Sequence, residues 1–237
     1  MQRYFAKDKQ GCNIYLNPDD LYHIRTVMRM DSHDKIQVVY ENRVYLCCLE
    51  NVKTNIQIII EKELPVLEEK MPKVTLLIPL LKEQKMDFIL QKATELGVDT
   101  IIPIETERSI IKAKEEKMDK KIERWSRICK EASEQSYRVD IPKILPLKKL
   151  QELKNLEGLK LICSTIETQK NIRFVLNSCQ DCDRINIAIG PEGGFSISEE
   201  EKWNQAGFLS VSLGNRIMRV ETVPLYILSI LNFYYME

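Results

Sequence analysis

The most constraining feature of this sequence is a change in its periodicity near residue 73. From there, continuous apolar runs alternate with segments of helical spacing. Lys73–Leu80 is an apolar run typical of a buried parallel strand. Lys82–Leu96 follows with apolar residues three and four positions apart, which indicates a helix, and Gly97 is placed to end it. This alternation predicts an α/β domain with a mostly parallel sheet.

The same alternation continues to the end of the chain. We predict strands over residues 100–104, 159–164, 185–189 and 208–213, and helices over 119–136, 171–177, 198–205 and 222–235. Ser198 and Glu201 have the spacing of a capping box at the start of one helix. The last helix is apolar nearly all round, so it must be buried, either within its own subunit or against a second copy.

The first 70 residues follow a different pattern. Short β-rich runs at 36–40, 44–49 and 56–60 are separated by turn-like stretches, which predicts a small β-barrel or sandwich. A short helix is expected over 19–30, and the charged stretch Glu61–Lys73, with its two prolines, indicates a linker. We therefore expect two domains, at residues 1–70 and 73–237.

Composition limits the classes of function. The 237 residues include 35 Lys+Arg and 35 Asp+Glu, so the formal net charge is +0. Bulk positive charge therefore cannot drive nucleic-acid binding, and such binding would need a local basic patch. The N-terminal residues do not have the pattern of a signal peptide, and the apolar runs are too short to span a bilayer. We expect a soluble, cytoplasmic protein with no membrane partner.

The chain has seven cysteines and two histidines. With so few histidines, a metal cluster or a Ser-His-Asp catalytic triad is poorly supported. The odd count and irregular spacing of the cysteines argue against a secreted disulfide framework. Cys179 and Cys182 form a C-x-x-C pair, but no second ligand pair accompanies them. They are either two thiols near a helix end or a redox or metal pair. We expect no metal site.

Two loops, each between a predicted strand and a predicted helix, have the most unusual composition. Gly190–Ser196 reads G-P-E-G-G-F-S and lies where open α/β sheets bind ligands. It matches neither a Walker loop nor G-x-G-x-x-G, and is either a tight turn or a ligand loop. Leu213–Thr222 reads L-G-N-R-I-M-R-V-E-T. Its Arg216 and Arg219 either pair with local carboxylates or recognise a planar carboxylate, phosphate or base edge.

Together these two loops resemble the bacterial 16S rRNA uracil-N3 methyltransferases of the SPOUT class. Further segments agree with that family: Lys82–Gly97 with its K-x-x-K-M-(D/E) helix, Glu105–Ser109 with its S-E-R-S/C strand exit, Glu131–Arg138 with its E-A-x-E-Q-S/C-G-R helix end, and Arg3–Phe5 and His23–Arg29 at the N-terminus. The resemblance spans nearly the whole chain. It departs at Tyr137, usually Gly; at Asp140, often basic; and at Val220, usually Thr.

The resemblance implies an N-terminal, RNA-binding PUA-like β-barrel and a C-terminal methyltransferase domain containing a deep trefoil knot. It implies S-adenosylmethionine as cofactor and a homodimer as the working form. The substrate would be 16S rRNA within the small ribosomal subunit, methylated at N3 of a uridine near its 3′ end. Two alternatives stay open. One is a related enzyme that methylates a ribose 2′-hydroxyl or another base; the other is a non-catalytic RNA-binding protein of ribosome assembly.

The resemblance also assigns site residues. The residues that it implies for cofactor binding are Gly190, Glu192, Gly193, Gly194, Leu213, Gly214, Ile217, Met218 and Thr222. Glu192 would either hydrogen-bond cofactor hydroxyls or brace its loop. Arg219 would stabilise the negative charge that develops on uracil when N3 loses its proton. Glu221 would either orient Arg219 or help that proton depart.

A second set of residues is expected to face RNA. Its basic members are Arg3, Arg25, Arg29, Lys85, Arg108 and Arg138. These would contact phosphates, which set register and affinity rather than sequence specificity. Tyr4 would either stack on a splayed base or pack in the core of the N-terminal domain.

Overall fold

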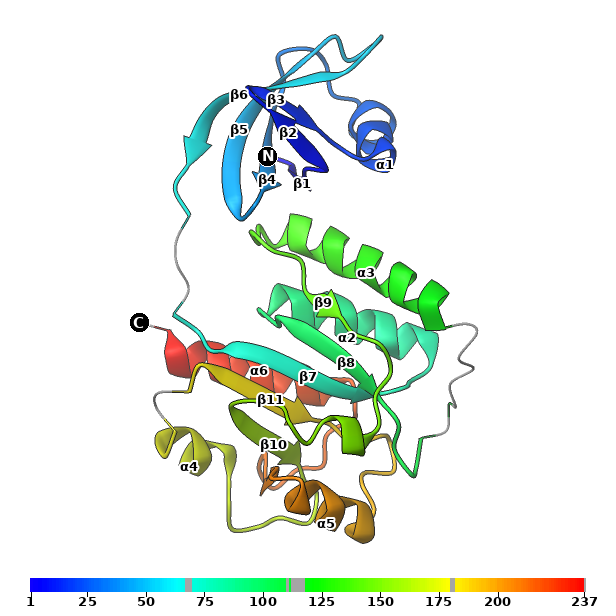
Figure 1. Cartoon of the computed structure of the whole chain (residues 1–237), viewed down its shortest axis with the longest axis vertical. Coiled ribbons are helices and arrows are strands. Elements are labelled where there is room, and N and C mark those ends of the chain that lie inside the picture. Colours follow the sequence, from blue (N-terminus) through cyan, green and yellow to red (C-terminus); the bar gives the residue numbers. More distant parts are fainter. Residues whose placement is uncertain (67–69, 110, 112–117, 180–181, 237) are drawn as a thin grey trace. The chain divides into compact units, whose positions relative to one another are not determined.

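The computed structural model describes residues 1–66, 70–109, 111, 118–179 and 182–236. The chain forms two compact units (Figure 1). The first comprises residues 1–69 together with 130–141, and the second comprises 70–129 together with 142–237. Residues 130–141 therefore cluster with the first unit, whereas the sequence pattern assigned them to the second domain.

The first unit is built on a six-stranded sheet in the order β1-β4-β5-β6-β3-β2. Its strands are β1 (Arg3–Phe5), β2 (Asp8–Gln10), β3 (Asn13–Tyr15), β4 (Lys35–Tyr40), β5 (Arg43–Glu50) and β6 (Gln57–Leu64). β1 pairs with β4 in parallel, and the other neighbours are antiparallel. α1 (Pro18–Tyr22) continues into a π-helical turn, His23–Val27.

Alternating apolar residues form the core of this unit. Ile36 and Val38 of β4, and Cys47 and Leu49 of β5, are each 0% exposed. The three predicted strands are therefore confirmed, although β6 runs to Leu64 and takes the first residues of the expected linker. β1, β2 and β3 were not predicted, because three-residue strands are too short to show a period of two.

The helix expected over residues 19–30 is shorter in the structure. The helical segment ends at Val27. Arg29 then adopts a φ of +52°, in the left-handed region, which a right-handed helix does not contain. The prediction was wrong for the last three residues of that range.

The second unit contains a six-stranded sheet in the order β12-β10-β11-β7-β8-β9, with every neighbouring pair parallel. The strands are β7 (Lys73–Pro79), β8 (Thr100–Ile104), β9 (Lys143–Ile144), β10 (Leu159–Cys163), β11 (Arg184–Ala188) and β12 (Leu209–Val211). The helices are α2 (Glu83–Glu95), α3 (Met118–Gln135), η3 (Leu150–Glu152), α4 (Ile172–Asn177), α5 (Ile197–Gln205) and α6 (Thr222–Tyr235). The predicted α/β fold with a mostly parallel sheet is confirmed.

Both faces of this sheet are covered. In β7, Leu76, Leu77 and Ile78 are all 0% exposed, as a strand buried on two faces requires. Leu77 shares one apolar cluster with Trp203 of α5. α2 and α6 contact each other, and Asn232 Nδ2 donates to the carbonyl of Leu96 at 2.9 Å.

Two local predictions for this unit were wrong. The N-cap of α5 is Ser196 rather than Ser198: Ser196 Oγ accepts from the backbone N–H of Glu199 at 3.0 Å. β12 covers only three residues of the predicted 208–213 strand, because residues 212 and 213 already belong to a loop. β9 was missed, since two residues carry no periodic signal. Within the described ranges, no helix has the length and apolar character to cross a membrane.

Candidate active site

Three loops emerge at the same edge of the parallel sheet. Residues 164–168 follow β10, residues 190–195 follow β11, and residues 212–218 follow β12. Because β10 lies between β11 and β12 and all three strands are parallel, these loops are neighbours at the carboxyl edge. Ligands of open α/β sheets bind at this edge.

A cavity of about 340 Å³ lies among these loops. Its lining residues are Cys163, Ser164, Thr165, Glu167, Thr168, Ser212, Leu213, Gly214, Asn215, Arg216, Ile217, Met218 and Val223. This size falls within the usual range for small-molecule sites. Four predicted cofactor residues therefore line one cavity: Leu213, Gly214, Ile217 and Met218.

The loop after β10 was missed by the sequence reasoning. It contributes Ser164, Thr165, Glu167 and Thr168 to the cavity. Its composition is ordinary. However, it follows a predicted strand of the parallel sheet, so it begins at the same carboxyl edge as the other two loops. Thr165 Oγ1 lies 3.7 Å from the position that a Cβ on Gly194 would take, so this loop also adjoins the loop after β11.

The lining combines apolar side chains with polar groups that could hydrogen-bond a ligand. Gly214 has a φ of +117°, and a Cβ built there would meet nothing within 4 Å, so the glycine opens the cavity. Ile217 is 85% exposed, which leaves an apolar side chain uncovered at the lining. Desolvation raises the pKa of Cys163 to about 12, so that lining thiol is neutral at physiological pH.

The other predicted cofactor residues do not line this cavity. Gly190, Glu192, Gly193 and Gly194 lie in the adjoining loop, and Thr222 is the exposed first residue of α6. A Cβ on Gly190 would come within 3.1 Å of the Phe195 backbone nitrogen, so the turn is closely packed at this position and a larger residue would have to displace its neighbour.

Arg108 holds the loop after β11. Its Nη1 donates to the carbonyl of Gly193 at 2.8 Å and to that of Phe195 at 3.3 Å. Glu107 contacts the same region, since its carboxylate accepts from Ser196 Oγ at 2.5 Å and from Lys202 Nζ at 2.9 Å. Arg108, predicted to face RNA, is thus exposed but also braces this loop.

An ion cluster connects both predicted loops to α2. Lys85 Nζ lies 3.0 Å from Glu192 Oε1 and 3.4 Å from Glu221 Oε2. The hydrogen bond to Glu192 raises the pKa of Lys85. Burial opposes ionisation of Glu192, but a backbone hydrogen bond and Lys85 outweigh it and lower the pKa of that carboxyl. These contacts are consistent with the alternative in which Glu192 braces its loop.

Arg219 is the exposed cation beside this cluster. Within the described part of the chain, its side chain makes no hydrogen bond or ion pair, and the same holds for Arg216. Neither arginine therefore pairs with a local carboxylate there. Glu221 has Lys85 rather than Arg219 as its ion partner, so the expectation that Glu221 orients Arg219 is not met by the contacts.

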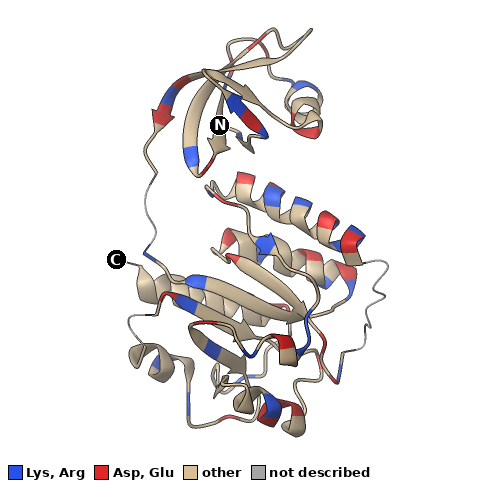
Figure 2. Ribbon diagram, viewed as in Figure 1, with Lys and Arg blue, Asp and Glu red and all other residues tan. Residues whose placement is uncertain are grey.

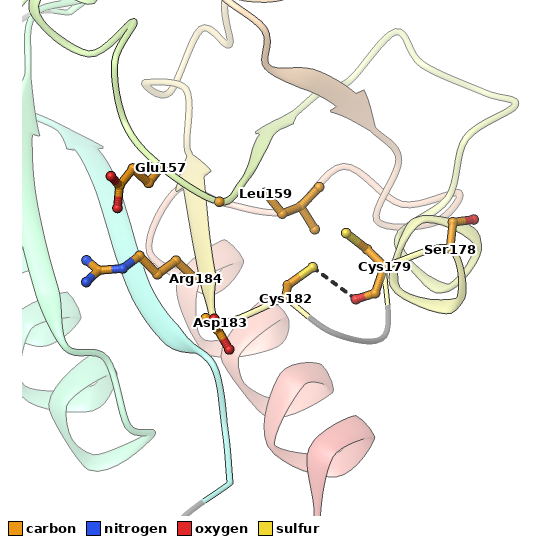
Figure 3. A pocket seen from close by; sticks show the side chains of 8 residues that line it. Glu157, Leu159, Ser178, Cys179, Cys182, Asp183 and Arg184 are labelled. Atoms are coloured by element: carbon orange, nitrogen blue, oxygen red, sulfur yellow. Dashed lines mark hydrogen bonds between the residues drawn. The ribbon is translucent and has the colours of Figure 1, made fainter.

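The C-x-x-C pair lies in a different cavity, of about 670 Å³ (Figure 3). Glu157, Gly158 and Leu159 precede or begin β10, and Asp183 and Arg184 precede or begin β11, so this cavity is at the amino edge of the sheet. There Cys182 Sγ contacts the carbonyl of Cys179 at 2.9 Å. Among the described residues, no group of three or more His, Cys, Asp or Glu side chains is arranged to hold a metal ion.

Comparison with known proteins identifies the family of this chain. The family model of the RNA methyltransferase domain matches residues 68–232. Ribosomal RNA small subunit methyltransferase E of Bacillus subtilis is 32% identical, over 98% of this chain and 96% of that protein. The same enzyme of Aquifex aeolicus is 33% identical, over 98% and 99% respectively.

This chain belongs to the ribosomal RNA small subunit methyltransferase E family.

Solved structures of similar chains extend the comparison. The family member from Neisseria gonorrhoeae, solved bound to S-adenosylmethionine, has a TM-score of 0.87 and 29% identity, covering 99% of this chain and 98% of that one. A Legionella pneumophila protein solved with the bound cofactor has a TM-score of 0.89 and 31% identity, covering 98% of this chain and 97% of that one.

The structure shows the surroundings of two departures from the family's sequence pattern. Tyr137 stands where the family usually has Gly, and its φ of +60° is the left-handed conformation that favours glycine. Val220 stands where the family has Thr and is 4% exposed, so this change lies in the core rather than in the cavity. The Arg219 and Glu221 positions on either side are unchanged.

Two of the four N-terminal residues expected to face RNA, Tyr4 and Arg3, serve the fold of the first unit instead. Tyr4 is 2% exposed, and its hydroxyl lies 2.9 Å from His23 Nδ1, so the stacking role is wrong and the core alternative holds. Arg3 is 9% exposed and donates to Gln37 Oε1 at 3.0 and 2.6 Å and to the carbonyl of Tyr137. That guanidinium is committed to the protein's own groups.

Arg138 is also internally paired. Its side chain is 12% exposed and lies 3.0 Å from Asp140, the position that is often basic in the family. Arg25 and Arg29 remain exposed, although Arg25 Nε donates to the carbonyl of Val52 at 3.0 Å. Basic and acidic residues are interspersed along the ribbon of both units (Figure 2). Arg25 and Arg29 are therefore the N-terminal candidates still accessible to RNA.

A buried charge cluster in the first unit was not predicted at all. Lys130 Nζ contacts Asp20 and lies 3.1 Å from Glu134 Oε1. The side chains of Lys130, Asp20 and Glu134 are 23%, 8% and 12% exposed. Two carboxylates share one ammonium, and burial raises the pKa of Glu134 to about 7. This cluster joins α1 to the end of α3.

Proposed function

We propose that this chain is an S-adenosylmethionine-dependent methyltransferase that acts on 16S rRNA within the small ribosomal subunit. The observation that carries the proposal is the cavity at the carboxyl edge, lined by four of the predicted cofactor residues in a chain of this family. The relatives from Bacillus subtilis and Aquifex aeolicus are named as ribosomal RNA small subunit methyltransferases, which supports 16S rRNA as the substrate.

The residues around the cavity fit the proposed cofactor. Ile217 and Met218 would contact adenine, and backbone groups of Leu213 and Gly214 would supply its few hydrogen bonds. When bound, S-adenosylmethionine supplies a methyl group carried on a sulfonium. Since the leaving group of such a transfer is neutral, the chain's main contribution is to orient the reacting atoms.

The proposed target atom is N3 of a uridine near the 3′ end of 16S rRNA. That nitrogen carries a proton, and its loss leaves negative charge on the carbonyl oxygens of the base. Arg219 is our proposed stabiliser of this charge, because its exposed guanidinium has no partner among the described residues. An arginine cannot serve as an ordinary base, so Glu221 is the proposed aid to proton departure.

The remaining expectations also stay proposals. We infer a PUA-like barrel with an RNA-binding role for the first unit, a trefoil knot in the second, and a cytoplasmic homodimer.

α6 buries Ile227, Leu228 and Leu231 within its own subunit, yet Phe233 is 79% exposed. A second copy covering the exposed side of α6 would bury that aromatic ring. Arg25 and Arg29 are the proposed phosphate contacts of the first unit.

Calorimetric titration with S-adenosylmethionine tests the proposal. We expect the wild-type chain to bind one cofactor per subunit and Gly214→Val to lose binding, because the valine would have to adopt an unfavourable φ and would project from the lining of the cavity. Gly11→Val is a matched control, since Gly11 also has positive φ and open space but lies in the first unit. No binding by wild type would favour the non-catalytic RNA-binding alternative.

A further inference from the structure

Lys85 lies between the segments of the candidate active site rather than on a free surface. α2 supplies Lys85, the loop after β11 supplies Glu192, and the residue before α6 supplies Glu221. The side chains of these three residues are 32%, 33% and 20% exposed. One ammonium group therefore connects three segments that are distant in the sequence.

The geometry makes this ammonium necessary for the local charge balance. Glu192 and Glu221 both approach the same Nζ, at 3.0 and 3.4 Å, so the two carboxylates are close to each other. Glu221 Oε2 is buried and accepts no hydrogen bond within the described residues. A buried carboxylate oxygen without a counter-ion is costly, and the Lys85 ammonium is the cation within reach.

We propose that Lys85 is a positioning residue for methyl transfer. It fixes the loop after β11 beside the cofactor cavity, and it occupies Glu221 so that this carboxylate does not pair with Arg219. The inference rests on the proposed function, and it replaces the expectation that Lys85 contacts RNA phosphate. An ammonium has three N–H donors, and here it faces two carboxylates of the protein itself.

The chain offers a matched control on the same helix. Lys92 of α2 pairs with Glu95 at 2.8 Å, and its side chain is 35% exposed against 32% for Lys85. Lys92→Met therefore removes the same charge from the same helix without touching the two loops. Lys85→Arg keeps a cation between the carboxylates, whereas Lys85→Met keeps only the apolar stem.

The first measurement needs no cofactor. Amide hydrogen exchange of the full chain should show about tenfold faster exchange at residues 190–195 and 220–224 in Lys85→Met, because both segments lose their shared anchor. Lys85→Arg and Lys92→Met should exchange like wild type there. Faster exchange spread evenly over the whole chain in Lys85→Met would assign Lys85 a general role in stability and overturn the proposal.

The second measurement separates positioning from RNA contact. With purified small subunits as substrate, Lys85→Met should raise the Kd for S-adenosylmethionine about tenfold and lower kcat, while KM for the subunit stays within about twofold. Lys85→Arg should recover both values to within about threefold. A raised KM with unchanged cofactor Kd and unchanged exchange would show a phosphate contact instead. If wild type itself binds no cofactor, the proposed function fails, and the exchange measurement still decides the role of Lys85.

Discussion

Arginines of the family motifs differ in burial and in hydrogen-bond partners between the two units. In the first unit, Arg3 and Arg138 are buried or nearly so and bind the protein's own groups. In the α/β unit, Arg216 and Arg219 are exposed and have no partner among the described residues. Arg3 and Arg138 thus maintain the structure of the first unit, whereas Arg216 and Arg219 are available for a ligand in the second. Substitutions of the paired residues should accordingly change stability, and substitutions of the two unpaired arginines should change activity.

The largest effect is expected at Arg219. Arg219→Ala should lower kcat for methyl transfer about 100- to 1000-fold, the usual result of removing one charge-stabilising group. Because the exposed side chain makes no hydrogen bond or ion pair within the described residues, the melting temperature should stay within about 1 °C of wild type. Single-turnover assays with small subunits, together with calorimetry, would measure both. A variant that keeps near-normal kcat would remove Arg219 from the mechanism.

Lys130 should show the reverse behaviour. Lys130→Met leaves the Asp20 and Glu134 carboxylates buried without a counter-ion, which should lower the free energy of unfolding by about 3–5 kcal/mol. Urea unfolding at pH 8 measures the change. Lys35→Met is the control: its pair with Glu61, at 2.8 Å, is more exposed and should contribute less than about 1 kcal/mol. Equal effects of the two variants would contradict the distinction between buried and exposed pairs.

The pH dependence of the free energy of unfolding tests the same cluster. The expected change is smaller than that of Lys130→Met, and its direction is specified. Burial raises the pKa of Glu134 from 4.5 to about 7, so the folded state binds this proton more tightly than the unfolded state. The stabilisation is therefore complete below about pH 4.5 and is lost as the pH rises through 7, by about 1–3 kcal/mol. Lys130 of α3, Asp20 of α1 and the Phe5 backbone of β1 face this carboxyl.

Glu134→Gln isolates that contribution, because glutamine keeps the shape of the side chain but does not titrate. Urea unfolding at pH 5 and pH 8 should show a smaller loss of stability for Glu134→Gln than for wild type. Equal losses of stability in the two proteins, or a wild-type stability that rises from pH 5 to pH 8, would contradict the assignment.

The smallest effect is expected at the amino edge of the α/β sheet. The Cys179 and Cys182 pair lies in a cavity that shares no residue with the one at the carboxyl edge. The double variant Cys179→Ser/Cys182→Ser should keep kcat and cofactor Kd within about twofold of wild type. Assays with and without a thiol reductant would reveal a redox role, and a reductant-dependent kcat that disappears in the variant would overturn this expectation.

Periodicity predicted the α/β unit well because its elements are long and buried. β7 is apolar on both faces, and α2 keeps its apolar spacing over several turns, so packing and local pattern agree. β1, β2, β3 and β9 were missed because two or three residues show no period. The assignment of residues 130–141 to the first unit was also beyond the sequence, since it depends on distant contacts such as Lys130 with Asp20.

Residue type indicated the two candidate loops, and the family resemblance assigned the site residues within them. The glycines and arginines of residues 190–196 and 213–222 marked both loops, and part of the second lines the cavity. The partners of charged residues could not be predicted in this way. Lys85 and Arg219 are equally plausible partners for Glu221 in the sequence, and only the three-dimensional placement of α2 distinguishes them. For the same reason, the burial of Arg3 was not evident from composition, whereas core packing of Tyr4 was one of the two alternatives left open.

The most direct test of the central claim is methylation of small subunits isolated from a strain that lacks this protein. The purified chain and S-adenosylmethionine are added, and the 16S rRNA is analysed by nucleoside mass spectrometry and reverse transcription. We predict one 3-methyluridine per subunit and a reverse-transcription stop at a single position near the 3′ end, both absent with Arg219→Ala. A 2′-O-methylated nucleoside, or no methylated product from the wild-type chain, would contradict the account.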